Sequence, residues 1–291
     1  MQGTILQGIG GFYTAMDDAG VRYTLRAQRK LRRDRKPKVG DRVELIPGTG
    51  EEDGWIQAIL PRRNELDRPP VANIDRIVIV AAAGAPAADL PLVDRMLVAA
   101  RRRNIAPVLA VTKCELDPDM AREIVRQYRG ADVSAIAVSA HTGENVAALK
   151  EMLRGSVHAL AGQSGAGKSS LINALYGMEL ETGSLSEKIE RGKNTTRRSE
   201  LIPLEGGGMV LDTPGFSLLE TEPFDPVELK ESYPEFEALE GGCYFQPCYH
   251  ASEPKCAVRD AVAAGEIDEK RHGRYVELLE EMRMKWRERY D

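Results

Sequence analysis

The chain has 291 residues, of which 42% are hydrophobic and 29% charged, and its net charge is −5. This length accommodates two or three domains, and no stretch approaches the 18 consecutive apolar residues of a membrane-spanning helix. The first residues lack the cationic and apolar segments of a secretory signal, so we expect a cytoplasmic protein with no membrane partner. The net charge averages over uneven stretches, because residues 22–42 contain ten Lys or Arg and only two Asp, whereas 219–240 is acidic. Such a basic patch is more informative about partners than the overall charge.

Residues 1–70 alternate apolar and polar residues in short runs, such as DRVELI and GWIQAIL, with Gly and Pro between them. Five short strands of this kind predict a small β-barrel, most simply one of the OB type. The segment LRAQRKLRRDRKPK would form a basic loop on this barrel, and RPPVANID (68–75) a linker. The loop is interpreted as an RNA phosphate-binding segment, with a merely solvated basic loop as the alternative. Its basic residues are Arg26, Arg29, Lys30, Arg32, Arg33, Arg35, Lys36 and Lys38.

From residue 74 the pattern changes to apolar runs that end in Gly-rich or Ser/Thr-rich turns, such as IDRIVIVAAA, APVLAVTK and VHALAGQ. Helical stretches such as LPLVDRMLVAARRRN lie between several of them, which predicts a parallel α/β sheet. The last segment places Tyr275, Leu278, Leu279, Met282 and Trp286 at helical spacing. We therefore predict a barrel over 1–70, an α/β domain over 71–221 and a helical domain over 222–291.

A phosphate-binding loop is predicted at 162–169, where GQSGAGKS matches G-x-x-x-x-G-K-[ST] between a strand-like run and the helix-like SSLINALYG. Its glycines let backbone N–H groups close around phosphates, Lys168 can reach the β and γ oxygens, and Ser169 can bind Mg²⁺. The alternative is a chance Gly-rich turn, which the flanking strand and helix disfavour. The predicted phosphate-binding residues are Gly162, Gln163, Ser164, Gly165, Ala166, Gly167, Lys168, Ser169 and Ser170.

Two later segments have the spacing of nucleotide switches. In LDTPGF, Asp212 stands at a strand end, where it can hold a Mg²⁺-bound water, and the N–H of Gly215 can reach the γ-phosphate. In RGKNTTR, one threonine of the pair at 195–196 is expected to complete the Mg²⁺ shell. The predicted magnesium set is therefore Ser169, Thr196 and Asp212. Together with the phosphate loop, these segments indicate a nucleotide triphosphatase.

The segments TKCE (112–115) and VSA (138–140) match base-binding elements that follow the phosphate loop in an ordinary GTPase, but here they precede it. A sheet tolerates a new cut in its chain when the old termini lie close together, so this order predicts a circular permutation of one GTPase domain. The Glu115 carboxylate would accept hydrogen bonds from the N1–H and exocyclic amine of guanine. The alternative for TKCE is a turn before a helix with a surface Glu. The predicted base-binding residues are Thr112, Lys113, Glu115, Ser139 and Ala140.

Three of the four cysteines lie close to a histidine near the C-terminus, in the order Cys243-x4-Cys248-x-His250-x5-Cys256. In a cytosolic protein this spacing indicates metal binding rather than disulfides. A Cys₃His set suits one tetrahedral, structural Zn²⁺ with no open coordination position. The alternative is a group of reduced cysteines without metal.

The permuted order, with a barrel before it and a Cys/His cluster after it, resembles the ribosome small-subunit-dependent GTPase A family over essentially the whole chain. The segments GQSGAGKSSLIN, RGKNTTR, DTPGF and CYFQPCYHASEPKCAV are each similar to segments of that family, in the expected order. The resemblance implies a multidomain fold with an OB-type barrel, a circularly permuted P-loop GTPase domain and a helical zinc-binding domain. It further implies a bacterial GTPase that binds GTP, GDP and ribosomal RNA, acts late in small-subunit assembly and is stimulated by that subunit. We expect a monomer.

Three residues depart from the usual pattern. Glu115 is one methylene longer than the usual Asp, which can cost about 1–3 kcal/mol of guanine selectivity. Phe216 stands where many GTPases carry a water-orienting Gln, and Asn194 where relatives carry a His; an amide cannot take a proton at neutral pH. We therefore expect slow intrinsic turnover, with Lys168, Asn194, Thr196 and Gly215 as catalytic residues and a partner supplying the acceleration.

The leading interpretation is thus an RNA-associated, ribosome-activated GTPase that uses Mg²⁺. A second is a nucleotide-gated RNA-binding module whose hydrolysis is nearly lost, which the three departures motivate. A third, a P-loop ATPase or small-molecule kinase, is disfavoured by TKCE, by VSA and by the lack of an acceptor-binding motif.

Overall fold

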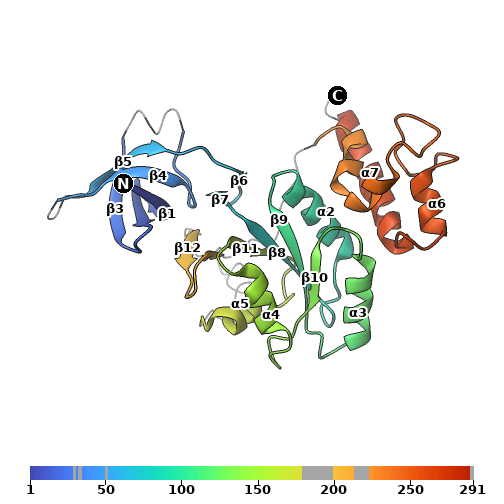
Figure 1. Ribbon diagram of the computed structural model, residues 1–291, viewed down its shortest axis with the longest axis horizontal. Coiled ribbons are helices and arrows are strands. Elements are labelled where there is room, and N and C mark those ends of the chain that lie inside the picture. Colours follow the sequence, from blue (N-terminus) through green and yellow to red (C-terminus); the bar gives the residue numbers. More distant parts are fainter. Residues whose placement is uncertain (29–30, 32–34, 50–51, 179–198, 213–222, 289–291) are drawn as a thin grey trace.

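The computed structural model describes residues 1–291 except 29–30, 32–34, 50–51, 179–198, 213–222 and 289–291. Its described strands form an eleven-stranded sheet, ordered β10-β9-β8-β11-β13-β12-β1-β2-β3-β5-β4, and a separate pair, β6-β7. Figure 1 shows the N-terminal barrel on one side, the α/β layers in the middle and the C-terminal helices on the other side.

The first part of the sheet closes into a five-stranded barrel. β1 pairs with both β2 and β4, β3 runs parallel to β5, and β4 pairs with β5, so the ring closes in the order β1-β2-β3-β5-β4. Strand alternation turns fully buried residues such as Ile5, Leu25 and Ile56 into its interior. The predicted OB-type β-barrel is confirmed. Its strands are β1 (Gln2–Ile9), β2 (Phe12–Asp17), β3 (Arg22–Ala27), β4 (Arg42–Ile46) and β5 (Gly54–Ile59).

The segment predicted as a linker, 68–75, is folded. β6 (Glu65–Asp67) and β7 (Pro70–Ala72) form an antiparallel pair, and Val71 and Ile74 are completely buried. Two successive prolines suggested a free connector, but Pro70 occupies the first position of a strand in a two-stranded pair, where a missing N–H is tolerated. The connection between barrel and α/β layers is therefore packed rather than free.

The middle of the chain forms the predicted parallel sheet, with one antiparallel edge. β10, β9, β8, β11 and β13 run parallel, β12 is antiparallel to β13, and Gln7 of β1 pairs with Glu200 of β12. These strands are β8 (Arg76–Ala82), β9 (Ala106–Thr112), β10 (Ser134–Ala137), β11 (Val157–Ala161), β12 (Glu200–Pro203) and β13 (Met209–Asp212).

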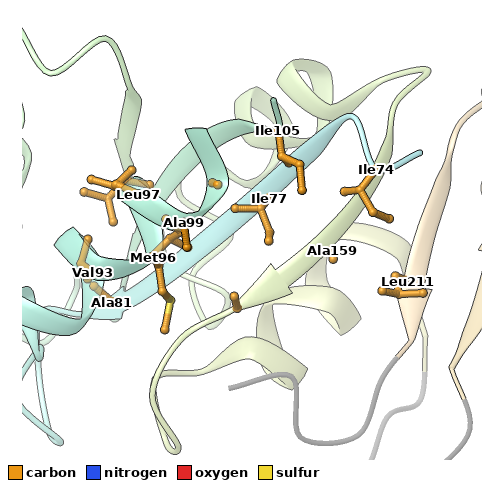
Figure 2. Packing of buried hydrophobic residues seen from close by; sticks show 14 of the residues in the cluster. Ile74, Ile77, Ala81, Val93, Met96, Leu97, Ala99, Ile105, Ala159 and Leu211 are labelled. Atoms are coloured by element: carbon orange, nitrogen blue, oxygen red, sulfur yellow. The ribbon is translucent and has the colours of Figure 1, made fainter. Parts of the chain in front are cut away.

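Helices cover both faces of this parallel sheet. Ile77 and Ile79 of β8 face a core shared with α2 and α3, whereas Val78 and Val80 face a core shared with α4 and α5. Figure 2 shows Met96 of α2 lying over β8 in the first of these cores. The helices are α2 (Leu90–Arg101), α3 (Pro118–Gln127), α4 (Val146–Leu153) and α5 (Lys168–Tyr176).

The C-terminal part is helical, as predicted, and rests on α2. Its aromatic core includes Tyr233, Phe236 and Tyr275, and Val98 of α2 belongs to the same cluster. The acidic stretch before the cysteines forms two 3₁₀ helices. The elements are η1 (Pro226–Ser232), η2 (Pro234–Leu239), α6 (Ala257–Ala263) and α7 (Glu269–Glu288).

Candidate nucleotide-binding site and metal centre

Four loops meet at the carboxyl ends of the parallel strands. They follow β8, β9, β10 and β11, which are adjacent in the sheet. Ligands of open α/β sheets bind at this edge. The loop after β11 is the predicted phosphate loop, and α5 begins inside it at Lys168, so the N–H groups at the start of the helix point into the same place.

The phosphate loop has the backbone that its glycines permit. Gly162, Gly165 and Gly167 all have positive φ angles, and a Cβ on Gly162 would lie 2.3 Å from the carbonyl oxygen of Val80. The Lys168 ammonium donates to the carbonyl oxygens of Gly162 (2.6 Å) and Gln163 (2.8 Å), and burial lowers its pKa. Lys168 therefore lies over its own loop, where a triphosphate would meet it.

The TKCE segment lies directly against this loop although more than fifty residues separate them. The Thr112 hydroxyl donates to the carbonyl oxygen of Ala166, and the Lys113 ammonium donates to that of Gly165 at 2.9 Å. A Cβ on Gly167 would lie 3.5 Å from the Thr112 hydroxyl oxygen. The two stretches therefore lie in contact, as the permuted order requires.

Glu115 carries a buried acceptor in the loop after β9. Its Oε2 is buried and has no hydrogen-bond partner within the described ranges. Asp117, not Glu115, caps the next helix, since its carboxylate accepts from the N–H of Met120 at 2.9 Å. Glu115 does lie in the turn before α3, as in the alternative, but its side chain is half-buried rather than exposed. A buried acceptor without a donor is costly, and the N1–H and amine of guanine would satisfy it.

The loop after β10 is held by internal hydrogen bonds at the predicted second base contact. Ser139 is completely buried, its hydroxyl accepts from the N–H of Thr142 (3.0 Å), and its own N–H donates to the carbonyl oxygen of Glu144 (3.1 Å). Ala140 follows it and is half-buried. Because the Ser139 N–H is engaged and its side chain is buried, base contacts from this loop would come from the neighbouring backbone.

The described magnesium-binding candidates stand on nearby elements. Asp212 ends β13, which pairs with β11, and Ser169 lies in the first turn of α5 just after β11. Burial raises the pKa of the Asp212 carboxyl, a shift that a bound cation would oppose. A hydroxyl and a carboxylate are hard oxygen ligands that suit Mg²⁺. Asn194, Thr196 and Gly215 lie outside the described residues, as does Phe216.

Sequence reasoning missed a fifth segment, 84–89, which borders the phosphate loop. The Gln163 amide donates to the carbonyl oxygen of Ala87 (2.9 Å) and accepts from the N–H of Asp89 (2.7 Å). Asp89 in turn caps α2 through the N–H of Leu92. The only signal in the sequence is an Asp before a helix with Pro in its first turn, which predicts the cap but not the contact.

The four predicted zinc ligands come together in the C-terminal part. The sulfur of Cys256 lies 3.8 Å from those of Cys243 and Cys248, and the Nδ1 atom of His250 lies 3.4–3.6 Å from Cys256 and Cys243. A tetrahedron with Zn–S bonds of about 2.3 Å has an edge of about 3.8 Å. All four side chains are buried, and the carbonyl oxygen of His250 lies 2.8 Å from the ring of His272. The geometry fits a closed structural Zn²⁺ site.

The basic residues of the barrel are not equivalent. Arg26 belongs to β3, and its guanidinium pairs with Asp53 at 2.8 Å. Lys38 is largely buried between the carboxylates of Glu65 and Asp67. Arg35 and Lys36 are exposed. The other predicted RNA-binding residues lie outside the described ranges; they are Arg29, Lys30, Arg32 and Arg33.

Fold and site together define a circularly permuted P-loop GTPase with an N-terminal barrel and a C-terminal Cys₃His centre. Residues 59–222 match the RsgA GTPase family, and residues 2–56 match the RsgA N-terminal domain. The chain belongs to the RsgA GTPase family, which confirms the resemblance noted in the sequence. None of the helices in the described part of the chain is both long and apolar enough to cross a membrane.

Full-length relatives and solved structures agree with this assignment. The chain is 42% identical to a small ribosomal subunit biogenesis GTPase RsgA of Caldanaerobacter subterraneus, covering 100% of this chain and 98% of the relative. It is 42% identical to the RsgA of Geobacillus thermodenitrificans, covering 97% of each. YjeQ from Thermotoga maritima superposes with a TM-score of 0.82 at 33% identity, covering 97% of this chain and 98% of that one. YloQ, described as a circularly permuted GTPase, gives 0.80 at 32% identity, with 98% and 95% covered.

Proposed function

We propose that this protein hydrolyses GTP to GDP and phosphate during late maturation of the small ribosomal subunit in the cytoplasm, and that this subunit stimulates the reaction. The observation that carries the proposal is the contact of TKCE with the phosphate loop, beside the unpartnered Glu115 oxygen. A guanine at Glu115 and phosphates at Lys168 are the two ends of one nucleotide. The names of the relatives support the link to the small ribosomal subunit.

Each group in the site has a role in this reaction. The N–H groups of the phosphate loop and of the start of α5 bind the phosphate oxygens. When the nucleotide binds, the Lys168 ammonium exchanges the carbonyl oxygens of Gly162 and Gln163 for phosphate oxygens. Mg²⁺, when bound with the nucleotide, neutralises phosphate charge. Ser169 and Asp212 would hold it, with Thr196 completing the set.

Intrinsic turnover is slow in this proposal. Phe216 has no polar group with which to orient the attacking water, and the amide of Asn194 can orient water but cannot take its proton at neutral pH. The N–H of Gly215 would hold the γ-phosphate. Binding to the small ribosomal subunit accelerates hydrolysis, in the way that partner proteins accelerate hydrolysis by other GTPases.

The flanking domains bind ribosomal RNA and position the GTPase. Arg35 and Lys36, which are exposed, neutralise RNA phosphates together with Arg29, Lys30, Arg32 and Arg33, so that affinity falls steeply with salt. Arg26 and Lys38 are already paired with carboxylates and contribute less. The Cys₃His centre would hold one structural Zn²⁺ per chain, because its four ligands leave no position open for chemistry.

Hydrolysis of GTP and of ATP, each measured with and without purified small ribosomal subunits, tests the proposal. We expect slow GTP turnover, below about one per second for the isolated chain, marked stimulation by the subunit, and little ATP hydrolysis under either condition. GTP binding without any turnover, even with subunits, would instead support the nucleotide-gated RNA-binding module. ATP turnover equal to that of GTP would contradict both.

A further inference from the structure

β10 is an open edge of the eleven-stranded sheet. The strand at the other end of the sheet order, β4, also pairs with β1 and so closes the barrel. Among the described strands of this sheet, β10 is therefore the one with a single neighbour, β9. Its residues, Ser134–Ala137, include no charged residue, proline or bulge. Apart from its short length, the strand thus lacks the features that protect sheet edges from further pairing.

The strand register shows which backbone groups of β10 face outward. The N–H of Val138, directly after β10, donates to the carbonyl oxygen of Val111 on β9 at 2.8 Å. Backbone groups of a strand face the same neighbour at every second residue, so those of Ala135 and Ala137 point away from β9. The Ala137 carbonyl oxygen accepts from the Asn145 amide at 2.9 Å. Within the described residues, the outward N–H and C=O groups of Ala135 have no partner.

A cleft of about 1040 Å³ opens beside the start of this edge. It lies at the amino ends of β8, β9 and β10, between the loops that follow α2 and α3. The nucleotide loops lie at the opposite edge of the sheet, because they follow the carboxyl ends of the same strands. Ser134 and Ala135 line the cleft, so the cleft is continuous with the open edge of β10.

The cleft carries an excess of positive charge. Its charged lining consists of Arg76, Arg101, Arg129 and Asp132. Arg101 donates only to backbone carbonyl oxygens, including that of Ser232 at 2.7 Å, and burial lowers the pKa of its guanidinium. In the part of the chain that the structure describes, the side chains of Arg76 and Arg129 have no hydrogen bond or ion pair. Carboxylates of a ligand would balance this charge.

The open edge and the charged cleft together favour a peptide strand with acidic side chains. When a strand adds to a sheet edge, main-chain hydrogen bonds provide affinity and side-chain pockets provide specificity. RNA phosphates would pair with the arginines, but RNA has no row of N–H and C=O groups to match Ala135. A second copy of β10 has that row but brings no carboxylate, since its residues are Ser, Ala, Ile and Ala.

We propose that the open edge of β10 and the arginine-lined cleft form a docking site for an extended, acidic segment of a protein partner. The segment adds to β10 as a further strand by pairing with Ala135, and carboxylates at one end of it bind Arg76 and Arg129. The site lies at the edge of the sheet opposite the nucleotide, so the proposal goes beyond GTP hydrolysis and does not depend on it.

Binding of a fluorescent peptide of about eight residues, alternating Val and Glu, to the full chain tests the charged part of the site. We expect Arg76→Gln and Arg129→Gln each to weaken binding about tenfold, the scale of one lost hydrogen bond to a charged group. Arg122→Gln is the matched control. Arg122 lies on α3 outside the cleft lining, its side chain is 71% exposed and it pairs with Asp119, so this variant should bind the peptide as the wild type does.

Two changes test the main-chain part of the site. Ala135→Pro removes an N–H that points away from β9, and sheet edges tolerate proline at such positions. It should weaken peptide binding by about tenfold or more, while GDP binding stays at the wild-type level. With the wild-type protein, N-methylation of the peptide at one set of alternate residues should abolish binding, and methylation of the other set should preserve it, because an added strand bonds through every second residue.

Several outcomes would overturn the docking site. They are absence of saturable binding of the acidic peptide to the wild type, equal binding of a peptide with Lys in place of Glu, and equal loss of binding for both methylated peptides. Displacement of the peptide by single-stranded RNA, with Ala135→Pro binding the peptide as the wild type does, would indicate a phosphate site instead.

These outcomes are distinguishable from failure of the proposed function. Arg129→Gln should keep the GTP turnover of the isolated chain, because Arg129 lies at the edge of the sheet opposite the nucleotide loops. Lack of stimulation of the wild type by small subunits would contradict the proposed function whatever the peptide shows. Normal stimulation without binding of the acidic peptide would overturn the docking site alone.

Discussion

A buried ionic cluster joins α7 to α2, and we expect it to hold the C-terminal part on the GTPase layers. Arg271 donates to one oxygen of Asp94 at 2.7 Å and to Glu235, and Arg274 donates to the other Asp94 oxygen. The Asp94 and Arg271 side chains are only 1% and 3% exposed. Two cations and two carboxylates balance, so Asp94→Asn leaves one excess buried positive charge without changing the shape of the side chain.

The expected cost follows from this burial. Removing one partner of a buried ion pair typically costs about 3–5 kcal/mol, because the other charge stays buried without compensation. Several domains unfold in this chain, so one overall free energy of unfolding is not well defined. Native-state hydrogen exchange of the α7 amides measures the local opening free energy instead, and we expect Asp94→Asn to lower it by that amount.

The same two helices provide the control. Arg95 of α2 pairs with Glu281 of α7 at 2.8 Å, but these side chains are 41% and 32% exposed. Exposed pairs contribute about 0–1 kcal/mol, so Glu281→Gln should change α7 exchange only slightly. If Asp94→Asn changed it no more than Glu281→Gln, the buried cluster would not be what anchors α7.

Three further results are expected. Burial lowers the pKa of His158 to about 4, below its unfolded value of about 6.5, so its contribution to stability is fully present above pH 6.5 and is lost as the pH falls. The opening free energy of the β11 amides, measured by native-state hydrogen exchange, should therefore be about 2 kcal/mol lower at pH 5 than at pH 7, and His158→Gln should remove this difference. An equal pH dependence in wild type and His158→Gln would contradict this. Metal analysis should find about one zinc per chain, and Cys248→Ser should make 223–288 protease-sensitive while the described parts of 1–212 keep their wild-type cleavage rates. Metal-free protein with an unchanged cleavage pattern would contradict the zinc centre. Thr112→Val, which cannot donate to Ala166, should weaken fluorescent GDP binding about threefold to tenfold and Thr112→Ser restore it; equal affinity for GDP in all three proteins would exclude a role for this bond.

Motifs with a local chemical requirement could be predicted from the sequence. The phosphate loop needs glycines where φ is positive and a Lys and a Ser at the start of a helix, so its position could be predicted from residue types. The Cys₃His centre could be predicted in the same way, because a metal site needs particular ligand types at short spacing. The permutation followed from the order of TKCE and GQSGAGKS, because strand pairing does not depend on where the chain is cut.

Features that depend on packing could not be predicted. The contacts of segment 84–89 run through backbone carbonyls such as that of Ala87, which leave no signature in residue type. The prolines at 69–70 suggested a linker, and only the pairing of β6 with β7 shows that it is folded. Phe12 and Tyr13 are adjacent aromatics, and the sequence did not say which was core; the register of β2 turns Tyr13 inward and Phe12 outward.

Binding of GDP, XDP and ADP to wild-type and Glu115→Gln protein tests most directly whether TKCE and the phosphate loop hold one guanine nucleotide. Xanthine carries a carbonyl where guanine carries its amine, so an amide donor at position 115 suits XDP and a carboxylate suits GDP. We expect the wild type to bind GDP more tightly than XDP or ADP. Glu115→Gln should bind GDP at least about tenfold more weakly than the wild type does, the scale of a lost hydrogen bond to a charged group, and should bind XDP more tightly than the wild type does. Unchanged affinity for GDP in the variant, with no gain for XDP, would mean that Glu115 does not contact the base.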